Sequence, residues 1–409
     1  MDQSAWAARI RSEIAAEFER TSPPEDFPPL APVPAGRYTD PGFFELEREH
    51  LWRRTWLLVA REEDFEGAGS FRTTDRTGSP LLVVRGADGV LRAFFNTCQH
   101  RGAPVVREPC GSAKRLRCQY HSWTYDLDGR LLEVPDRRDF HDLDLGRRGL
   151  RPVRCESYGG FVFVNEDPEA EPLETWLGPV ADEWRSLRGG ELRALATRCE
   201  RTPANWKIVA DAFLETYHLR TIHTRTVAKL LDHRGAAMGL FPRGHSRMVT
   251  PKWASALEAQ RAFAARSDAP PAIEGIDPIF HDTNPAYSLF PNLITPLDAP
   301  GFPVIQLWPI DAETTEVEWT HYAPPPPTPE VDETWRAVFD RFDVVMDEDF
   351  ANLGPMQRSV ASGALRSIPL NYQERRIYHL HEEIDRVIGP ERVPPALRVE
   401  PRLERFWER

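Results

Sequence analysis

The fold is decided by two short segments, N-T-C-Q-H-R-G-A-P-V at 96–105 and C-Q-Y-H-S-W-T-Y at 118–125. Each segment offers one thiolate and one imidazole as metal ligands. They are Cys98 and His100 in the first, and Cys118 and His121 in the second. A C-x-H clamp followed by a C-x-x-H clamp can hold a zinc ion or an iron–sulfur cluster. The spacing therefore predicts a metal centre and leaves the metal open.

The residues around the clamps separate these two readings. Arg-Gly follows the first His at 101–102, and Ser-Trp follows the second at 122–123. With these flanks the stretch resembles the Rieske motif, in which two Cys hold one iron of a [2Fe-2S] cluster and two His hold the other. Rieske proteins of respiratory chains carry two further Cys, and this chain has Ala103 and Tyr120 in their places. In lacking these two Cys, the chain resembles soluble oxygenases and their ferredoxins. The resemblance implies that the cluster ligands are Cys98, His100, Cys118 and His121.

Length and composition describe an ordinary globular protein. A chain of 409 residues with 41% apolar and 28% charged residues is expected to form two domains, or three. The net charge of -12 argues against a nucleic-acid partner. The five cysteines are irregularly spaced and make a poor disulfide framework. No apolar run has the length of a membrane span and the N-terminus has no apolar signal core, so a cytoplasmic enzyme is expected.

The texture of the sequence changes along the chain. Residues 1–40 hold a helical pattern followed by a proline-rich lead-in. Residues 41–172 alternate short apolar runs with turn signals, which predicts an all-β domain that carries the cluster. Residues 173–409 form the second predicted domain, with a long helix that starts at Thr328-Pro329. Within it, residues 233–300 are rich in Pro, Gly and Asp and are expected to be irregular.

The segment from Asn205 to His223 is the second anchor of the sequence. In one continuous helix, Asp211, Glu215 and His218 would lie on one face at i, i+4 and i+7. His223 is rotated off that face, so both His can bind one metal only if the helix ends or bulges between them. Two separate surface His beside a solvated acidic edge is the alternative.

The same segment carries a second resemblance. N-W-K followed by E-x-Y-H-x-x-x-x-H resembles the mononuclear iron motif of Rieske non-haem iron oxygenases. In this family of aromatic-ring-hydroxylating dioxygenases and choline-monooxygenase-like enzymes, the two His and a distant Asp bind iron. That implies His218, His223 and an Asp on the long helix. Helical periodicity places Asp349 on the buried face, as does the family's E-D pattern, whereas Asp347 and Glu348 fit a solvated face better.

Two further residues of this segment are given roles, Glu215 from the resemblance and Asp211 from its place on the helix. The position of Glu215 implies a bridge that passes electrons from the Rieske His of one subunit to an iron-bound His of the next. Most ring dihydroxylases of the family have Asp there, and members acting on quaternary amines have Glu. Asp211 is predicted to support the iron site, with a simple hydrogen bond to nearby backbone as the alternative.

The predicted fold is α+β: an N-terminal all-β Rieske domain, then a helix-grip catalytic domain whose antiparallel sheet wraps a long C-terminal helix. The implied protein is a terminal oxygenase that uses O2 at mononuclear Fe(II). Its electrons come from NAD(P)H through a separate reductase, with or without a ferredoxin, because the sequence has no nicotinamide or flavin fingerprint. The resemblance also implies a homotrimer or a multiple of it.

The expected reaction is monooxygenation or oxidative demethylation of a small aromatic or N-methylated substrate. Arene cis-dihydroxylation is the alternative within the same enzyme class. A pure Rieske electron carrier and a zinc-stabilised binding protein are the alternatives of other classes.

Overall fold

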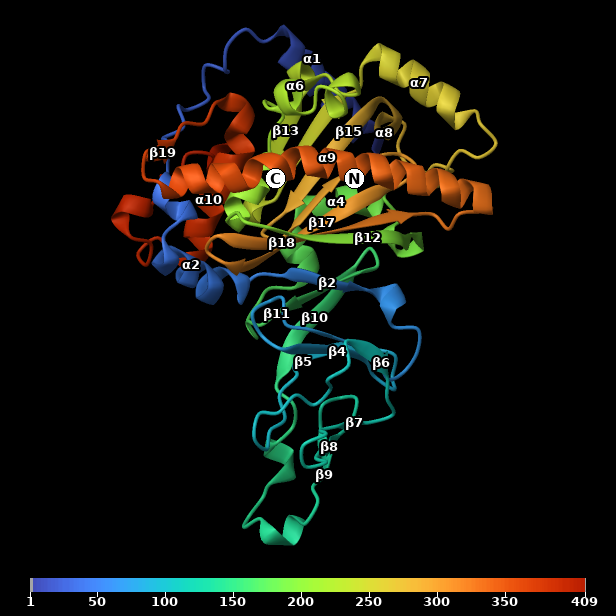
Figure 1. Ribbon diagram of the computed structural model, residues 1–409, viewed down its shortest axis with the longest axis vertical. Coiled ribbons are helices and arrows are strands. Elements are labelled where there is room, and N and C mark those ends of the chain that lie inside the picture. Colours follow the sequence, from blue (N-terminus) through green and yellow to red (C-terminus); the bar gives the residue numbers. More distant parts are fainter. Residues whose placement is uncertain (1–2, 409) are drawn as a thin grey trace. The chain divides into compact units, whose positions relative to one another are not determined.

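The computed structural model describes residues 3–408 (Figure 1). These residues form two compact units. Arg48–Trp176 make up one unit, and the segments before and after it make up the other. The proline-rich lead-in therefore belongs to the same unit as the second predicted domain. The domain boundaries predicted at residues 40/41 and 172/173 lie near the breaks between these units and stay a prediction.

The unit Arg48–Trp176 is built from β-strands. Its seven-stranded sheet has the order β2-β11-β10-β5-β4-β3-β6, and β7-β8-β9 form a second, three-stranded sheet. The strands are β2 Leu57–Arg61, β3 Ser70–Thr74, β4 Leu81–Arg85, β5 Leu91–Phe95, β6 Cys110–Ser112, β7 Leu116–Arg117, β8 Thr124–Tyr125, β9 Leu131–Glu133, β10 Pro152–Tyr158 and β11 Phe161–Asn165. Cys98 and Cys118 lie in the same buried cluster as Trp123 and Tyr125. The prediction that this segment forms an all-β domain is confirmed.

The other unit is organised by one antiparallel sheet and one long helix. The sheet has the order β12-β18-β17-β16-β15-β14-β13. Its strands are β12 Arg193–Thr202, β13 Ala237–Leu240, β14 Ser246–Pro251, β15 Thr283–Leu289, β16 Leu293–Pro296, β17 Phe302–Asp311 and β18 Thr314–Ala323. Helix α9, Pro329–Ala361, crosses in front of it in Figure 1. The side chain of Thr328 caps this helix by accepting from the backbone N–H of Val331. The predicted helix-grip architecture is confirmed.

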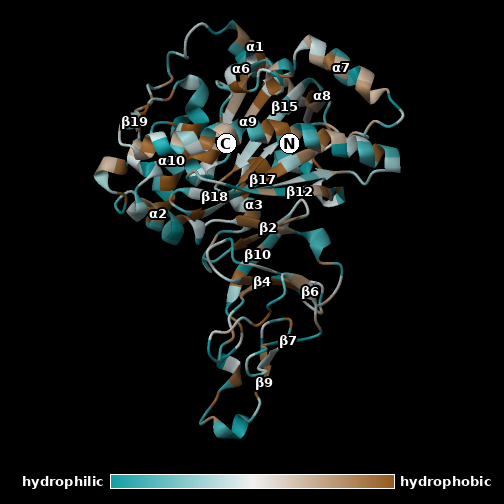
Figure 2. Cartoon of the chain, in the orientation of Figure 1, coloured by the Kyte–Doolittle hydropathy of each residue, from teal (hydrophilic) through white to brown (hydrophobic). Residues whose placement is uncertain are grey.

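The two faces of this sheet have different coverings. One line of paired residues crosses the strands and therefore shares a face: Ser246, Ser288, Ile294, Ile305 and Trp319. Trp319 Nε1 donates to Asp343 Oδ1 of α9 at 2.8 Å, so α9 covers this face, which we call the inner face. Figure 2 shows hydrophobic residues along β15 and β17, and a mixture of hydrophilic and hydrophobic residues along α9.

The opposite face of the sheet is covered by other segments. Arg247 Nη1 and Tyr287 Oη both donate to Glu183 of α4, Pro179–Arg185. Arg247 Nη2 also donates to Glu408 at 2.9 Å, which ties the end of the chain to the same place. Helix α1, Gln3–Glu19, joins this group through an ion pair of Arg9 with Glu408 at 2.7 Å.

The prediction that residues 233–300 are irregular is wrong. They contain β13, β14, β15 and β16, together with helices α7, Ala254–Ala264, and α8, Ile279–Asp282. β15 shows why the sequence hid them. Its inner face carries small residues such as Ala286 and Ser288, and its outer face carries Tyr287 bonded to a buried carboxylate. Such a strand lacks the alternation of apolar and polar residues that predicts β structure.

Four further helices belong to the same unit. They are α2 Pro41–Glu47, α5 Trp206–Phe213, α6 Leu219–Ile222 and α10 Arg375–Ile388. The segment before α2 is anchored to the C-terminal part of the chain, because β1, Val33–Pro34, pairs with β19, Ser367–Ile368. α3, Leu173–Leu177, ends the β-rich segment. None of the helices within residues 3–408 is long and apolar enough to cross a membrane.

Candidate metal centres

Helix α5 is shorter than the sequence predicts. Asn205 caps its start by accepting from the backbone N–H of Lys207 at 3.0 Å, and the helix ends at Phe213. Glu215 and His218 therefore do not continue the helical face of Asp211, and the predicted i, i+4, i+7 stripe is wrong. The Glu215 carboxylate accepts from the backbone N–H groups of Tyr217 and His218, which takes those donors out of a continuing helix.

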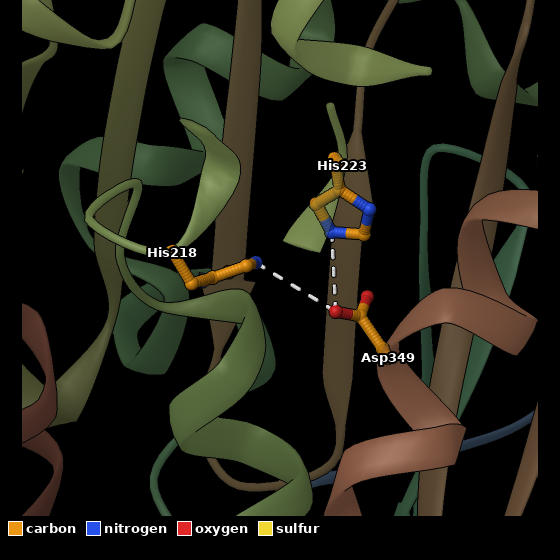
Figure 3. Close-up of side chains that lie close together, drawn as sticks. All are labelled: His218, His223 and Asp349. Atoms are coloured by element: carbon orange, nitrogen blue, oxygen red, sulfur yellow. Dashed lines mark ion pairs between the residues drawn. The ribbon is translucent and has the colours of Figure 1, made fainter. Parts of the chain in front are cut away.

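The break brings the two histidines together. His218 and His223 flank the single-turn helix α6, one at each end. Their Nε2 atoms face the same carboxylate oxygen, with His223 at 3.1 Å and His218 at 3.7 Å from Asp349 Oδ1 (Figure 3). One ligand atom from each of the three residues lies within 4.8 Å of the others. The structure thus places the three predicted iron ligands at one point, and Asp347 lies exposed on another side of α9.

The other ring nitrogen of each His is held by a second carboxylate. His218 Nδ1 is hydrogen-bonded to Glu215 Oε1. His223 Nδ1 lies 2.8 Å from Glu348 Oε2, and Thr226 donates to the same oxygen. A carboxylate on Nδ1 fixes the ring orientation and leaves Nε2 free to bind a metal. The prediction that Glu348 faces solvent is wrong, and its place beside Asp349 was the one signal in the sequence for this role.

The charges and donor atoms suit a divalent iron. Burial lowers the pKa of His223, while Asp349 and Glu348 raise it, and the net direction is upward. The two carboxylates thus favour a positive charge at this imidazole, and a bound metal cation would supply that charge. Two imidazole nitrogens and one carboxylate form the donor set of non-haem Fe(II) centres that keep coordination positions open. The residues present fit mononuclear iron.

The two clamps in the unit Arg48–Trp176 share one backbone design. Gly102 donates its N–H to Cys98 O at 2.9 Å, and Ser122 donates to Cys118 O at the same distance. Both donors have positive φ, 78° for Gly102 and 61° for Ser122. The left-handed conformation is easy for glycine and strained for serine, so the second loop holds its serine there against a local cost. Each Cys–His pair is therefore presented by the same tight turn.

The side chains of the two clamps approach one another in two pairs, His100 with His121 and Cys98 with Cys118. The rings of His100 and His121 have centroids 4.7 Å apart, and both cysteines are buried. Burial raises the pKa of the Cys98 thiol, and Cys118 beside it adds to the shift. His100 Nδ1 is buried without a hydrogen-bond partner within residues 3–408. Two neighbouring buried thiols can lose their protons readily only beside a cation, and the free nitrogen of His100 can accept a metal. Both features fit an iron–sulfur cluster.

Asp211 takes part in a hydrogen-bonded chain. Arg37 Nε donates to His381 Nδ1 at 3.0 Å, so the neutral His381 carries its proton on Nε2 and donates to Tyr38 Oη at 2.8 Å. Burial keeps His381 neutral by lowering its pKa. Tyr38 in turn donates to Asp211 Oδ2 at 2.7 Å. The Asp211 carboxylate thus accepts from a tyrosine hydroxyl. Its partner is neither the nearby backbone nor one of the candidate iron ligands.

Comparison with known families agrees with this geometry. Residues 181–390 match the profile described as "Ring hydroxylating alpha subunit (catalytic domain)", which is more than half of the chain. The chain belongs to this family. Residues 55–150 match the Rieske [2Fe-2S] domain. The chain therefore combines a Rieske domain with the catalytic domain of a ring-hydroxylating alpha subunit, and the second carries a His/His/Asp candidate site for mononuclear iron.

Individual relatives show which members of the family this chain resembles. The chain is 36% identical over 195 residues to the carnitine monooxygenase oxygenase subunit of Escherichia coli K12, covering 47% of this chain and 52% of the relative. It is 32% identical over 201 residues to the glycine betaine monooxygenase oxygenase subunit of Chromohalobacter salexigens, covering 49% and 45%. The aligned part spans about half of these relatives. A solved quaternary ammonium Rieske monooxygenase shares the fold, with a TM-score of 0.75 at 23% identity over 90% of this chain and 99% of the other.

Proposed function

We propose that this protein is a terminal oxygenase that hydroxylates a small N-methylated substrate, with oxidative demethylation or carbon–nitrogen cleavage as the result. The observation that carries the proposal is the convergence of His218 and His223 on Asp349. Iron bound there supplies the activation of dioxygen. One oxygen atom enters the substrate and the other leaves as water, which consumes two electrons and two protons.

The chain's own residues prepare this chemistry by fixing the ligands. Glu215 and Glu348 hold the two Nδ1 positions, so the imidazoles stay in the tautomer that presents Nε2. Gln357 of α9 accepts from the backbone N–H of Asn205 at 2.9 Å, which ties the start of α5 to the helix that carries Asp349. A rigid frame of this kind keeps the donor atoms in place when a substrate binds.

Electrons must come from another protein. We propose a separate reductase that takes them from NAD(P)H, because relatives of this chain are named as oxygenase subunits. Inter-subunit electron transfer is described for the solved quaternary ammonium Rieske monooxygenase. In this protein we propose the same, in a homotrimer or its multiple, with Glu215 as the bridge between subunits. The cytoplasmic location expected from the sequence also stays a prediction.

The choice of an N-methylated substrate has two supports. The carnitine and glycine betaine monooxygenases are named for quaternary ammonium substrates. The bridging position holds Glu215, as in family members that act on such amines. Arene cis-dihydroxylation remains the second candidate, since it uses the same iron ligands and the same electron supply.

Product analysis separates these candidates. The iron-loaded protein is combined with a surrogate reductase, NADH and isotopically labelled dioxygen, and offered quaternary ammonium compounds in one series and arenes in another. The proposal expects an aldehyde product with substrate-dependent NADH consumption in the first series. A labelled cis-diol from the arenes, with no reaction in the first series, would support dihydroxylation. No incorporation in either series, from a protein with both centres loaded, would refute the oxygenase function.

A further inference from the structure

Arg376, on α10, is a fully buried cation with neutral partners. Its side chain is 0% exposed. Nε donates to Ser246 Oγ at 2.9 Å and Nη2 donates to the backbone oxygen of Ala286 at 3.2 Å. Nη1 is buried and has no hydrogen-bond partner within the described part of the chain. A guanidinium has five donors in a fixed fork, and part of this fork is unused.

Other buried arginines of the same unit are paired with carboxylates. Arg37 Nη1 lies 2.6 Å from Asp385, and Arg247 Nη2 lies 2.9 Å from Glu408. Arg376 has no carboxylate within ion-pair distance among residues 3–408. The charged groups that act on it are Arg375 and Arg247, both positive, and together with burial they lower its pKa to about 9. A buried charge without a counter-charge is costly, so this position favours an anion.

The position of Arg376 relates it to the candidate iron site. Its partner Ser246 belongs to the inner face of the sheet, the face that α9 covers. Asp349 is on that same helix. Helix α10 is also linked to α5, the helix that ends just before Glu215, because His381 of α10 donates to Tyr38 Oη and Tyr38 donates to Asp211. The unpaired guanidinium is therefore on the iron side of the sheet.

An apolar group lies beside this cation. Met248 pairs with both Met238 and Ala286 across neighbouring strands, and these three residues pack together with Ala236. Ala286 supplies the backbone oxygen that Arg376 binds. Methionine side chains are flexible and polarisable and suit a methyl-bearing ligand. The inner face thus offers an anion-binding group next to an adaptable apolar surface.

We propose that Arg376 binds a carboxylate of the substrate, so that the enzyme acts on zwitterions that carry both a methylated nitrogen and a carboxylate. This inference rests on the proposed function and names the substrate class of the same site. The fork of Arg376 can donate two parallel hydrogen bonds to a carboxylate, which recognises its shape as well as its charge. Choline has the same trimethylammonium group as glycine betaine without the carboxylate, so the pair isolates the contribution of Arg376.

The test is equilibrium binding to the metal-loaded protein under anaerobic conditions, measured by calorimetry for glycine betaine and choline. We expect the wild type to prefer glycine betaine by at least about 30-fold, the range for a buried, hydrogen-bonded charge pair. Arg376→Gln should bind the two alike and keep the wild-type affinity for choline. Arg341→Gln, at an exposed position of α9, is the matched control and should keep the preference.

The result that overturns the proposal is equal affinity in the wild type, no measurable binding of glycine betaine, or a preference that survives in Arg376→Gln. If that variant does not fold, the wild type still decides. Acetate should then compete with glycine betaine and leave choline binding unchanged, and no effect of acetate would refute the role. Chloride that stabilises the protein without weakening glycine betaine binding would mean a structural anion only.

These outcomes are distinct from those of the proposed function. Arg376-dependent binding of glycine betaine by a protein that oxidises no quaternary ammonium compound would refute the function alone. Oxidation of choline as readily as glycine betaine would refute the substrate class alone.

Discussion

The substitution Asp211→Asn should make the protein more stable at neutral pH. Burial raises the pKa of the Asp211 carboxyl from 3.8 to about 7, against the opposing effects of Tyr38 and Lys207. Below the pKa of the unfolded chain, the carboxyl is protonated in both the folded and the unfolded protein. The contribution of this proton to the free energy of unfolding is then fully present. As the pH rises through about 7 the folded protein loses that proton, and the stability is lost. Asn stays neutral throughout and still accepts from Tyr38.

The size of the effect follows from the two pKa values. The difference between 3.8 and about 7 corresponds to ~4 kcal/mol over the whole range. Roughly 2 kcal/mol of this falls between about pH 5.5 and pH 7.5. For a unit of about 280 residues, with an unfolding entropy of about 2.1 cal/mol/K per residue, that is a change of roughly 3–4 °C in the unfolding midpoint.

Thermal unfolding of both proteins at a series of pH values measures this directly. The midpoint of Asp211→Asn should rise relative to the wild type between pH 5.5 and 7.5 and then stay level. Asp347→Asn, at an exposed position of α9, should follow the wild type at every pH. If the Asp211 variant also follows the wild type, its carboxyl is ionised in the folded protein and the reasoning from burial fails.

Three further substitutions test other parts of the structure. Lys207→Met removes the ammonium that lies 2.7 Å from the fully buried Glu47 and leaves this carboxylate with the Trp206 indole N–H as a donor and no cation. The change should cost about 3–5 kcal/mol in chemical unfolding, whereas adding Glu47→Met should recover most of it. Glu215→Gln should keep the iron and sulfide content and abolish coupled turnover, and normal turnover would remove the bridging role. Tyr125→Phe removes a hydroxyl 3.3 Å from Cys98 Sγ and should lower the cluster's reduction potential by roughly 60 mV in protein film voltammetry, while an unchanged potential would show that this contact does not tune the cluster.

The sequence predicted most where one local pattern determines the structure. Each clamp holds its Cys and His within a single tight turn, so the spacing alone predicts that they lie close together. Asp349 was separable from Asp347 because α9 is one regular helix and its apolar periodicity runs through to that position. In both cases a short-range rule and the final structure agree.

The sequence predicted least where distant contacts decide. Helix α5 ends early because the Glu215 carboxylate binds backbone N–H groups, and no periodicity records that bond. Glu348 looks like part of a solvated acidic run until His223 is placed opposite it. Arg376 lies on α10, which buries charged and histidine residues along much of its length. Hydropathy therefore does not show which side of this helix packs against the sheet.

The central claim is that this chain holds two different iron centres, one at the paired clamps and one at Asp349. The most direct test is the content of iron and acid-labile sulfide per chain in anaerobically purified wild type and Asp349→Ala. The account predicts about three iron and two sulfide in the wild type, and about two of each in the variant. Two iron and two sulfide in both proteins would contradict the mononuclear site. Zinc without sulfide would contradict both centres.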